Sequence, residues 1–421
     1  MKKLEVLLKD LEILHPKYID LSLSRINKLL KKIDNPHLDL PLCIHIAGTN
    51  GKGSILNFIK NIMIKSGYKV HAYISPHLEK INERFTISNN IITDKKLFET
   101  LKFIKKINNN QKITFYEITT AAAFYLFHNN KADFLLIETG LGGRLDATNV
   151  LKDNHISIIS PISLDHQEYL GKSLNKITRE KLGIIKKSSI IISAKQKRNV
   201  QEKIIKYSLK NQNKIFYYGK DWTIKQIDKK NFYIRKNKKI NKYKMPSLLG
   251  DHQVYNASTS IQTINILESK GYSFNRKNIN DGLISTKWPC RLEVLKKKSP
   301  IIILDGAHNI DGAKSLRKFI IKSKHKTWII LGMLNSKDIK SYLKILKNSI
   351  AGVIAINIPN EKNSLSKFDI KKACDNLNIF CSVEENITKA VYNLKNIQQA
   401  NQIIITGSLY LVGKVKKLLN N

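Results

Sequence analysis

From about residue 40 onward, short apolar runs alternate with longer stretches in which apolar residues recur at helical spacing. The first run, residues 42–46, leads into a glycine-rich turn and then into a helical pattern. Comparable runs follow at 69–74, 133–137, 156–159 and 190–192, and amphipathic stretches separate them. This alternation predicts a mostly parallel sheet covered by helices.

Residues 214–245 break this alternation. They are rich in lysine and contain strand-like pieces such as Thr223-Ile224 and Phe232-Tyr233-Ile234. We interpret them as a small antiparallel excursion from the main sheet, followed by a helix near residues 253–269.

A second set of apolar runs begins at residues 300–305 and continues at 328–332, 353–356 and 402–405. A chain of 421 residues is long for a single core, because cores usually stop growing beyond about 250–300 residues. We therefore predict an α/β protein with a P-loop-type N-terminal domain over 1–287, a linker over 288–297 and a smaller Rossmann-like domain over 298–421.

The formal charge of +40 invites the hypothesis of a nucleic-acid-binding protein. The positive residues are mostly lysines, and they are spread along the whole chain together with abundant Asn and Ile. A nucleic-acid footprint would cluster instead, and it would contain arginines for bidentate contacts. Uniform compositional bias accounts better for the charge, so we expect no nucleic-acid partner.

Several features bear on location. The first residues, Met1 to Glu5, are charged and lack the apolar stretch of a secretory signal. The longest aliphatic runs, such as 301–304 and 403–405, are too short to cross a bilayer. The four cysteines show no C-x-x-C spacing, which favours free thiols over a zinc site or disulfides. We expect a cytoplasmic protein with no membrane partner.

Open α/β sheets bind ligands beyond the carboxyl ends of their strands, which directs attention to Gly48-Thr49-Asn50-Gly51-Lys52-Gly53-Ser54. Its glycines let backbone N–H groups face a phosphate at a helix N-terminus, Lys52 can reach the outer phosphates, and Ser54 can offer a hydroxyl to Mg²⁺. The spacing differs from the ordinary P-loop, because two residues rather than four separate Gly48 from Gly51. We predict a phosphate-binding loop.

Ser75, Glu138 and His166 also follow or end apolar runs, and each is of a type that can bind a metal ion. Mg²⁺ prefers oxygen ligands and takes few from the protein, which suits Glu138 better than His166. Taken singly, Ser75 is also explained as a turn residue before Pro76, and His166 as a loop histidine that makes hydrogen bonds. For each residue the metal-ligand and the structural interpretation therefore stay open. Lys181, on local sequence alone, is one more solvated lysine on a helix.

Residues 138–149 combine three glycines with several charged side chains. The glycines let the backbone approach a ligand closely, while Arg144 and Asp146 supply a donor fork and an acceptor. A plain β-turn does not need this combination, so we predict a ligand-binding loop.

In their order, these motifs resemble the folylpolyglutamate synthase/dihydrofolate synthase branch of the Mur-ligase superfamily. The matching stretches cover nearly the whole chain, and residues 138–149 are the most family-specific. The others are Leu14-His15, 48–54, Ser75-Pro76-His77-Leu78, Glu83-Arg84, 114–117, Asp165-His166, Glu180-Lys181, Asn256-Ala257, Arg291-Leu292-Glu293, 305–309 and 407–410.

The resemblance implies a first domain like the Mur-ligase central domain and an ATP-dependent ligase. Such an enzyme would add L-glutamate to dihydropteroate, to tetrahydrofolate or to both through an acyl phosphate. ATP would be the co-substrate and two Mg²⁺ ions would take part. We expect a monomer whose partners are these small molecules.

The resemblance also implies residue roles. ATP would contact Thr49, Asn50, Gly51, Lys52, Gly53, Ser54, Asn256, Arg291 and Asp305. The pterin substrate would face Ile13, Leu14, His15, Pro16, Thr114, Phe115, Tyr116, Glu117, Leu145, Asp146 and Ala147. Metal ions would be held by Ser54, Ser75, Glu138 and His166, and glutamate by His308 and Ser408. Lys52, Lys181 and His308 would be catalytic, with Lys181 carbamylated.

Two positions depart from the family pattern. Cys290 precedes Arg291 where the family usually has glycine, so the backbone of the linker is expected to differ. Ile310 follows His308-Asn309 in place of proline, which should change only the start of a helix.

Two alternative functions were weighed. The alternative enzyme is a ligase of the same superfamily that acts on cell-wall precursors, and the motifs at 114–117 and 145–147 argue against it. The alternative from another class is a basic ATP-binding nucleic-acid protein, for which the chain contains no recognisable nucleic-acid module.

Overall fold

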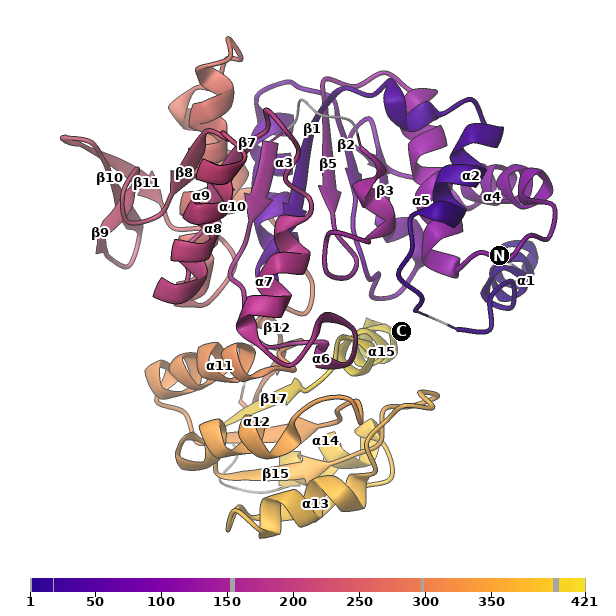
Figure 1. The fold of residues 1–421 in the computed structure, drawn as a ribbon. Helices are drawn as coiled ribbons and strands as arrows, with labels where there is room; N and C mark the ends of the chain where they lie inside the picture. The colour runs from indigo at the N-terminus through magenta and orange to yellow at the C-terminus, as the bar shows by residue number, and fades with distance from the viewer. Residues whose placement is uncertain (1, 18, 152–155, 297–298, 397–400, 421) are drawn as a thin grey trace. The chain divides into compact units, whose positions relative to one another are not determined.

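The computed structural model describes residues 2–17, 19–151, 156–296, 299–396 and 401–420. The chain forms two compact units, which we describe separately (Figure 1). The first contains Met1–Ile162, Gln167–Met245 and Tyr255–Thr286, and the second contains Ser163–His166, Pro246–Val254 and Lys287–Asn421. The domain limits at 287 and 298 stay predictions, and residues 297 and 298 lie outside the described residues.

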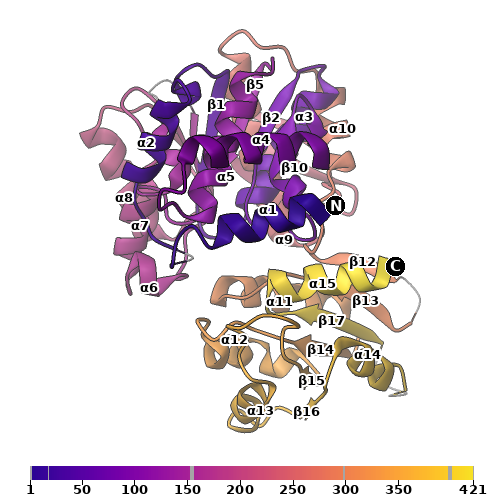
Figure 2. The same ribbon diagram turned by 90° about the vertical axis from the view of Figure 1, so that its right-hand side faces the viewer.

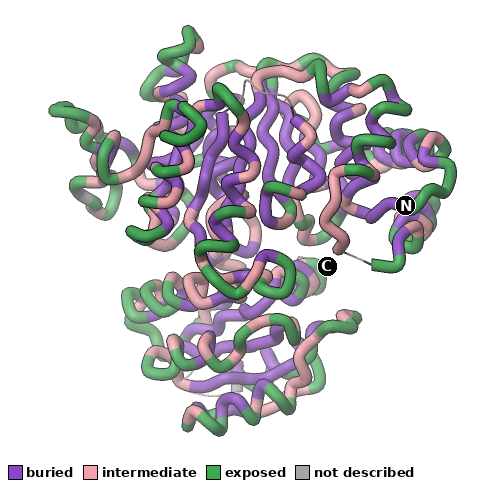
Figure 3. Tube along the Cα trace, viewed as in Figure 1, coloured by how far each residue is buried: buried purple, intermediate pink, exposed green. Residues whose placement is uncertain are grey.

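An eight-stranded sheet in the order β4-β3-β2-β5-β1-β6-β7-β8 forms the centre of the first unit. Its strands are parallel except for β3 and β4, which add an antiparallel edge. Their aliphatic runs are typical of strands buried on both faces (Figure 3). The bounds are β1 (Leu42–Ala47), β2 (Val70–Tyr73), β3 (Phe85–Ile87), β4 (Asn90–Ile91), β5 (Phe134–Glu138), β6 (Ile156–Ile159), β7 (Ile190–Ser193) and β8 (Ile215–Tyr217).

Helices cover this sheet. One apolar cluster joins the sheet to four helices, three of which, α1, α4 and α5, lie next to one another in Figure 2. These are α1 (Lys2–Glu12), α2 (Ser24–Lys32), α4 (Asp94–Asn108) and α5 (Phe115–His128). The others are α3 (Lys52–Lys65), α6 (Gln167–Leu170), α7 (Leu174–Leu182), α8 (Arg198–Lys210), α9 (Asp251–Glu268) and α10 (Arg276–Ser285), with 3₁₀ turns η1 (Pro36–Leu38), η2 (Ile81–Arg84) and η3 (Ala147–Val150). The helix expected near 253–269 is confirmed as α9.

The antiparallel excursion is smaller than predicted. A three-stranded antiparallel sheet consists of β9 (Thr223–Ile227), β10 (Asn231–Lys236) and β11 (Lys239–Lys244). The prediction was wrong at residues 214–217, because β8 pairs in parallel with β7 and extends the main sheet. The apolar run of β8 thus continues the parallel sheet.

The second unit contains a six-stranded sheet in the order β12-β13-β17-β14-β15-β16, in which β12 alone is antiparallel to its neighbour. Its strands are β12 (Glu293–Lys296), β13 (Ile301–Leu304), β14 (Thr327–Leu331), β15 (Gly352–Ala355), β16 (Cys381–Val383) and β17 (Gln402–Thr406). Its helices are α11 (Ile310–Ser323), α12 (Ile339–Leu346), α13 (Lys367–Asp375), α14 (Ile387–Asn396) and α15 (Leu409–Asn420), with the 3₁₀ turn η4 (Lys347–Ser349). The second α/β domain is confirmed.

Candidate functional site

The predicted phosphate loop connects β1 to α3, which begins at Lys52. A Cβ on Gly48 would lie 1.8 Å from Ser160 Oγ, and a Cβ on Gly51 would lie 2.7 Å from Asn256 Oδ1. Gly51 also has a φ of +83°, which side chains rarely tolerate. No side chain caps the first turn of α3, so its N-terminal amides face outward as an anion site requires.

Two backbone amides of this loop are already engaged. Thr49 and Asn50 both donate their N–H groups to the carbonyl oxygen of Pro161, at 3.0 and 3.1 Å. The amides left for a phosphate are therefore those that begin at Gly51. The expected ATP contacts of Thr49 and Asn50 stay predictions for other atoms of these residues.

Two lysine side chains converge on one carbonyl group. Lys52 Nζ donates to Gly48 O at 3.2 Å, and Lys181 Nζ from α7 donates to the same oxygen at 2.8 Å. Glu138 Oε1 lies 3.9 Å from Lys52 Nζ. Lys181 is only 4% exposed, so its default interpretation as a solvated lysine was wrong. Two ammonium groups at one carbonyl repel each other, and the carboxylate of Glu138 lies beside one of them.

Ser75 and Glu138 lie at the ends of neighbouring strands, because β2 pairs with β5 and places Tyr73 opposite Ile137. Glu138 is 6% exposed, and Ser75 Oγ is buried beside the Tyr116 hydroxyl, without a well-formed hydrogen bond among the described residues. An orphaned hydroxyl beside a buried carboxylate fits a hard cation such as Mg²⁺. Across the described chain, no three His, Cys, Asp or Glu side chains gather around a metal position. An ion here would therefore keep few protein ligands.

His166, the third predicted metal ligand, lies in the segment Ser163–His166 that groups with the second unit. Its φ of +48° is unusual for a residue other than glycine. Its role stays a prediction, as does that of Ser54, which is 3% exposed in the first turn of α3.

The predicted pterin motif at 114–117 begins α5 with a capping box. Glu117 Oε2 accepts hydrogen bonds from Thr114 N at 2.9 Å and from Thr114 Oγ1 at 2.8 Å. Arg25 Nε also donates to both oxygens of Glu117, at 3.1 and 3.0 Å. Sequence reasoning missed Arg25, because 92 residues separate it from Glu117. Glu117 is thus largely occupied in fixing the loop, Phe115 belongs to the apolar cluster of the first unit with Tyr116 packed against it, and their contact with a pterin stays a prediction.

The four residues of the predicted pterin segment 13–16 differ in how far they are buried. His15 is 5% exposed and its Nε2 lies 3.3 Å from Asp20 Oδ2, whereas Ile13 is 81% exposed. Leu14 packs against the apolar cluster of the first unit, and Pro16 is exposed. The structure therefore gives His15 and Leu14 the best-defined positions of the four.

The glycine-rich loop after β5 is tied together by Asp146. Its Oδ2 accepts from Leu141 N at 2.7 Å, and its Oδ1 accepts from Thr148 N and from Thr148 Oγ1, at 3.0 and 2.5 Å. Burial raises the pKa of Asp146, and these hydrogen bonds oppose the rise. A Cβ on Gly140 would lie 2.6 Å from Tyr116 Cζ, so this glycine is what lets the loop approach α5. Leu145 is half-buried and Ala147 is buried beside Asp146.

Not every charged residue of this loop faces inward. Arg144 is half-exposed and pairs with Glu180 at 3.1 Å, so its predicted donor fork is engaged on the surface. On the other side of Thr148, His45 Nε2 lies 2.8 Å from Thr148 Oγ1 within the sheet. Sequence reasoning missed His45, since it reads as part of an apolar strand.

A further basic residue lies beside the end of β2. Arg84, the last residue of η2, is 5% exposed and donates from Nε to His77 Nδ1 at 2.9 Å. Burial, and then the charge of Arg84, lowers the pKa of His77 to about 4. His77 therefore stays neutral at physiological pH and accepts this hydrogen bond.

In the second unit, three side chains gather around Asp165. Lys337 Nζ lies 2.5 Å from Oδ1, Asn309 Nδ2 donates to Oδ2 at 3.2 Å, and His308 Nε2 lies 3.5 Å from Oδ2. Burial alone would raise the pKa of Asp165, but the hydrogen bond and charge of His308 and the charge of Lys337 hold it well below its usual value. Sequence reasoning missed Lys337, which nothing distinguishes in so lysine-rich a chain.

Asp305 and Ser408 follow β13 and β17, which are neighbouring strands. Asp305 accepts hydrogen bonds from Leu292 N and Ala307 N, each at 3.0 Å, and burial raises its pKa while Arg291 opposes the rise. Ser408 is 3% exposed and its Oγ accepts from Tyr410 N at 3.1 Å. The second unit thus brings Arg291, Asp305 and Ser408 to one region of its sheet.

The two departures from the family pattern have simple structural counterparts. Cys290 has a φ of +59°, the left-handed conformation that glycine adopts most easily. Its backbone thus takes a conformation that costs cysteine more than glycine, and whether the linker differs from that of the family stays a prediction. Ile310 is the first residue of α11, and Asn309 caps that helix by accepting from Gly312 N at 2.9 Å. Ile310 thus stands at the start of a capped helix, and the effect of its replacing proline stays a prediction.

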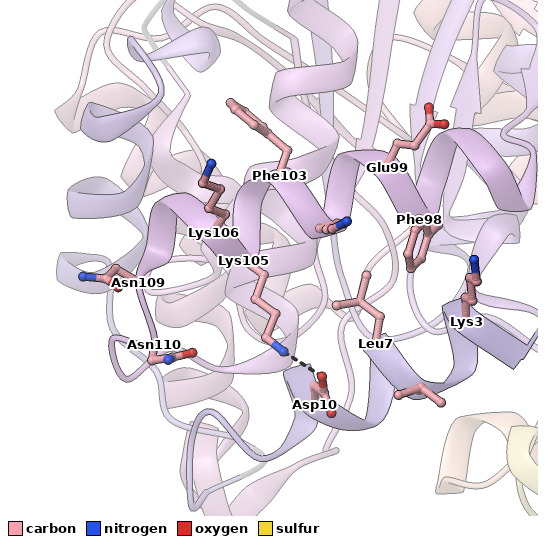
Figure 4. A pocket seen from close by; sticks show the side chains of 12 residues that line it. Lys3, Leu7, Asp10, Phe98, Glu99, Phe103, Lys105, Lys106, Asn109 and Asn110 are labelled. Carbon is pink, nitrogen blue, oxygen red and sulfur yellow. Dashed lines mark hydrogen bonds and ion pairs between the residues drawn. The ribbon is translucent and has the colours of Figure 1, made fainter.

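A separate groove of ≈950 Å³ lies between α1 and α4 (Figure 4). Leu7, Phe98 and Phe103 form its apolar part, and Lys105 pairs with Asp10 at 2.7 Å on its wall. None of the predicted site residues lines it. The candidate site is therefore at the strand ends and not in this groove.

Comparison with known proteins matches two parts of the chain, one in its N-terminal and one in its C-terminal region, to two family models. "Mur ligase middle domain" covers residues 46–264, and "Dihydrofolate synthetase, C-terminal domain" covers residues 290–419. The chain belongs to the Mur ligase family. In the part of this Mur ligase that the structure describes, no helix is both long enough and apolar enough to span a membrane.

Individual relatives agree with this placement. A protein from Schizosaccharomyces pombe named "Probable dihydrofolate synthetase" is 33% identical over 95% of this chain and 99% of its own length. The structure of Escherichia coli FolC in complex with DHPP and ADP superposes with a TM-score of 0.89, at 25% identity, over 99% of this chain and 97% of that one. A bifunctional folylpolyglutamate synthase/dihydrofolate synthase with Mn, AMPPNP and L-glutamate bound gives a TM-score of 0.87 at 25% identity, over 99% and 98%.

Proposed function

We propose that this Mur ligase joins L-glutamate to dihydropteroate with the consumption of ATP. The observation that carries the proposal is the position of Lys52 at the uncapped N-terminus of α3, beside Glu138. Such an arrangement of one cation and free helix amides suits a triphosphate. The family model of the C-terminal region and the relative from S. pombe both carry the name dihydrofolate synthetase, which favours dihydropteroate as a substrate.

In the reaction, an oxygen of the substrate carboxylate attacks the γ-phosphorus of ATP, and the bond from that phosphorus to ADP breaks. Lys52 and the α3 amides hold the phosphates and offset the charge that develops on them. The glutamate amine then attacks the carbonyl carbon of the acyl phosphate, and phosphate leaves as the amide forms. Phosphate is a good leaving group, whereas an unactivated carboxylate has none.

A divalent cation fits Ser75 and Glu138, with Ser54 and His166 as further candidate ligands. When bound, it neutralises phosphate charge as a Lewis acid. We propose Mg²⁺ as the ion and two as the number of ions.

We also propose that Lys181 is carbamylated. Addition of CO₂ to its amine would replace one of two adjacent cations with an anion, which removes the repulsion at the Gly48 carbonyl and gives Lys52 a counter-charge. Bicarbonate-dependent activity and a mass increase on Lys181 would support this modification.

The proposal extends to the second unit and to a second activity. His308 and Ser408 would meet glutamate, with His308 held by Asp165, while Arg291, Asp305 and Asn256 would contact the nucleotide. Extension of tetrahydrofolate by glutamate is the second candidate activity, since the bifunctional relative carries both names. A cytoplasmic location and a monomeric state also stay predictions.

The test is ADP release by the purified chain with dihydropteroate or tetrahydrofolate, each with and without L-glutamate. We expect ADP release that needs both dihydropteroate and glutamate. Release with tetrahydrofolate and glutamate would establish the second activity. ADP release that depends on neither pterin substrate would contradict the proposal.

A further inference from the structure

Arg84 is a buried cation for which the described part of the chain supplies no counter-ion. It is 5% exposed, its guanidinium carbon lies 5.7 Å from the centre of the Phe115 ring, and its one side-chain hydrogen bond goes from Nε to His77 Nδ1. Among the described residues, no carboxylate pairs with it and neither Nη nitrogen makes a hydrogen bond. Burial of an unpaired charge costs several kcal/mol. A ligand that supplies an anion would offset this cost.

The carboxylate next to Arg84 in sequence is not available to it. Glu83 Oε2 accepts from Leu78 N at 2.8 Å, and its Oε1 accepts from Glu79 N and Lys80 N at 3.0 and 2.9 Å. Glu83 therefore closes the 76–84 loop from within. The loop holds Arg84 in place without neutralising it.

Tyr116 lies near this cation. Its hydroxyl is buried without a hydrogen-bond partner among the described residues. Ser75 and Arg84 both lie close enough to Tyr116 to interact with it. Arg84 thus offers N–H donors that the described protein atoms leave unused, and Tyr116, beside Ser75, offers an O–H donor without a well-formed hydrogen bond.

The sheet order places these donors relative to the phosphate loop. The carbonyl of Arg84 accepts from Ile74 N at 3.1 Å, so Arg84 lies at the carboxyl end of β2. The order β2-β5-β1 puts Glu138 and Ser75 between Arg84 and the loop after β1. Arg84 directly precedes β3, and neighbouring strands are about 4.8 Å apart, so the three intervals from β3 to β1 span about 14 Å, which the long Arg84 side chain shortens. A carboxylate held at Arg84 would lie beside the metal-binding oxygens and face the phosphates.

We propose that Arg84 binds the carboxylate of the pterin-bearing substrate, which is the group that ATP activates. The inference rests on the proposed function. The two Nη groups donate to the carboxylate, and Tyr116 donates to the same group. After one oxygen has attacked the γ-phosphorus, the other remains the carbonyl oxygen of the acyl phosphate and keeps its hydrogen bond to the guanidinium.

The test pairs a change in the protein with a change in the ligand. Binding of dihydropteroate and of an analogue that lacks the carboxylate is measured by calorimetry without ATP, for the wild type, Arg84→Gln, Arg84→Lys and Arg198→Gln. Arg198 is a matched control, since it is 94% exposed and pairs with Glu202 on α8. Loss of a charge-assisted bidentate pair should weaken dihydropteroate binding about 10- to 100-fold in Arg84→Gln. Affinity for the analogue, and both affinities of Arg198→Gln, should stay within about twofold.

Three outcomes are informative. Equal weakening of both ligands would mean that Arg84 only supports the fold, and unchanged dihydropteroate affinity would also overturn the inference. If Arg84→Gln fails to fold, Arg84→Lys keeps the charge but loses the fork, and it should still show a selective loss for dihydropteroate. Failure of the wild type to bind dihydropteroate would contradict the proposed function instead.

Discussion

The strand-end loops of the two units differ in how far their charged side chains are paired with opposite charges. In the first unit, the one carboxylate within 4 Å of Lys52 among the described residues is Glu138, at 3.9 Å, and Arg84 has none. In the second unit, Asp165 is surrounded by Lys337, His308 and Asn309 at 2.5 to 3.5 Å. The first region is short of negative charge, whereas the charges of the second already satisfy one another.

This difference indicates what each region is built to receive. A triphosphate and a carboxylate bring several negative charges, so a region short of them is stabilised by the ligands. An amino acid such as glutamate carries charges of both signs, and a paired cluster can hold it without a large change in net charge. The predictions below remove charges or contacts on one side of this comparison.

The largest expected effect is on catalysis, from Lys52→Ala. Removal of the ammonium takes away a group that offsets charge on the transferring phosphoryl group, so kcat for ADP release should fall about 10²- to 10³-fold. Lys65→Ala, on the exposed end of the same helix, is the control and should retain activity. A rate near that of the wild type would rule out the phosphate role of Lys52.

The next effect is on stability, from Lys337→Met. The side chains of Lys337 and Asp165 are 9% and 8% exposed, so the change leaves a buried carboxylate without its closest cation. We expect the free energy of unfolding to fall by about 3 kcal/mol, as measured by urea denaturation. Lys340→Met, an exposed neighbour on α12, should change it by less than about 0.5 kcal/mol.

A pH effect in the second unit should be smaller. Burial, and then the charge of Arg291, lowers the pKa of His252 to about 4 from a usual 6.5. His252 has its usual pKa of 6.5 in the unfolded chain, so the unfolded chain takes up a proton at a higher pH than the folded chain does. Neutral His252 therefore contributes fully to the free energy of unfolding above pH 6.5, and this contribution is lost as the pH falls toward 4. Between pH 6.5 and pH 4, the free energy of unfolding of His252→Gln should fall by about 2 kcal/mol less than that of the wild type. An unchanged pH profile would show that His252 titrates normally.

In the first unit, Gly51→Ala tests the packing of the phosphate loop on Asn256. The new methyl group would lie 2.7 Å from Asn256 Oδ1, on a backbone with φ of +83°. Gly67→Ala is the matched control, because Gly67 has a φ of +88° with nothing within 4 Å. Both variants should lose about 1 kcal/mol from backbone strain, and only Gly51→Ala should also bind ATP at least about tenfold more weakly. Equal ATP affinity in the two variants would contradict the role of this contact.

The smallest effect is expected from Cys290→Gly. Glycine relieves the cost of the φ of +59°, about 1 kcal/mol, but loses the packing of a buried thiol. The two contributions should nearly cancel, which leaves the unfolding midpoint and ADP release close to those of the wild type. A loss of stability above about 2 kcal/mol would show that the thiol matters more than the backbone.

The sequence predicted the parallel strands, the phosphate loop and the second α/β domain, because each has a local signature of periodicity or glycine spacing. Arg25, Lys337 and the buried state of Lys181 have no such signature. Their partners are Glu117, Asp165 and Gly48, at separations of 92, 172 and 133 residues. The run at 214–217 misled us because three residues cannot distinguish a parallel edge strand from the start of a hairpin. Contacts of this range become visible only once the sheet order is known.

The most direct test of the central claim follows an oxygen atom. Dihydropteroate labelled with ¹⁸O in its carboxylate is turned over with ATP and glutamate, and the phosphate released is analysed by mass spectrometry. Attack of the carboxylate on ATP predicts one ¹⁸O atom in the phosphate for each amide formed. Phosphate without the label would contradict an acyl phosphate at the strand ends of the first unit.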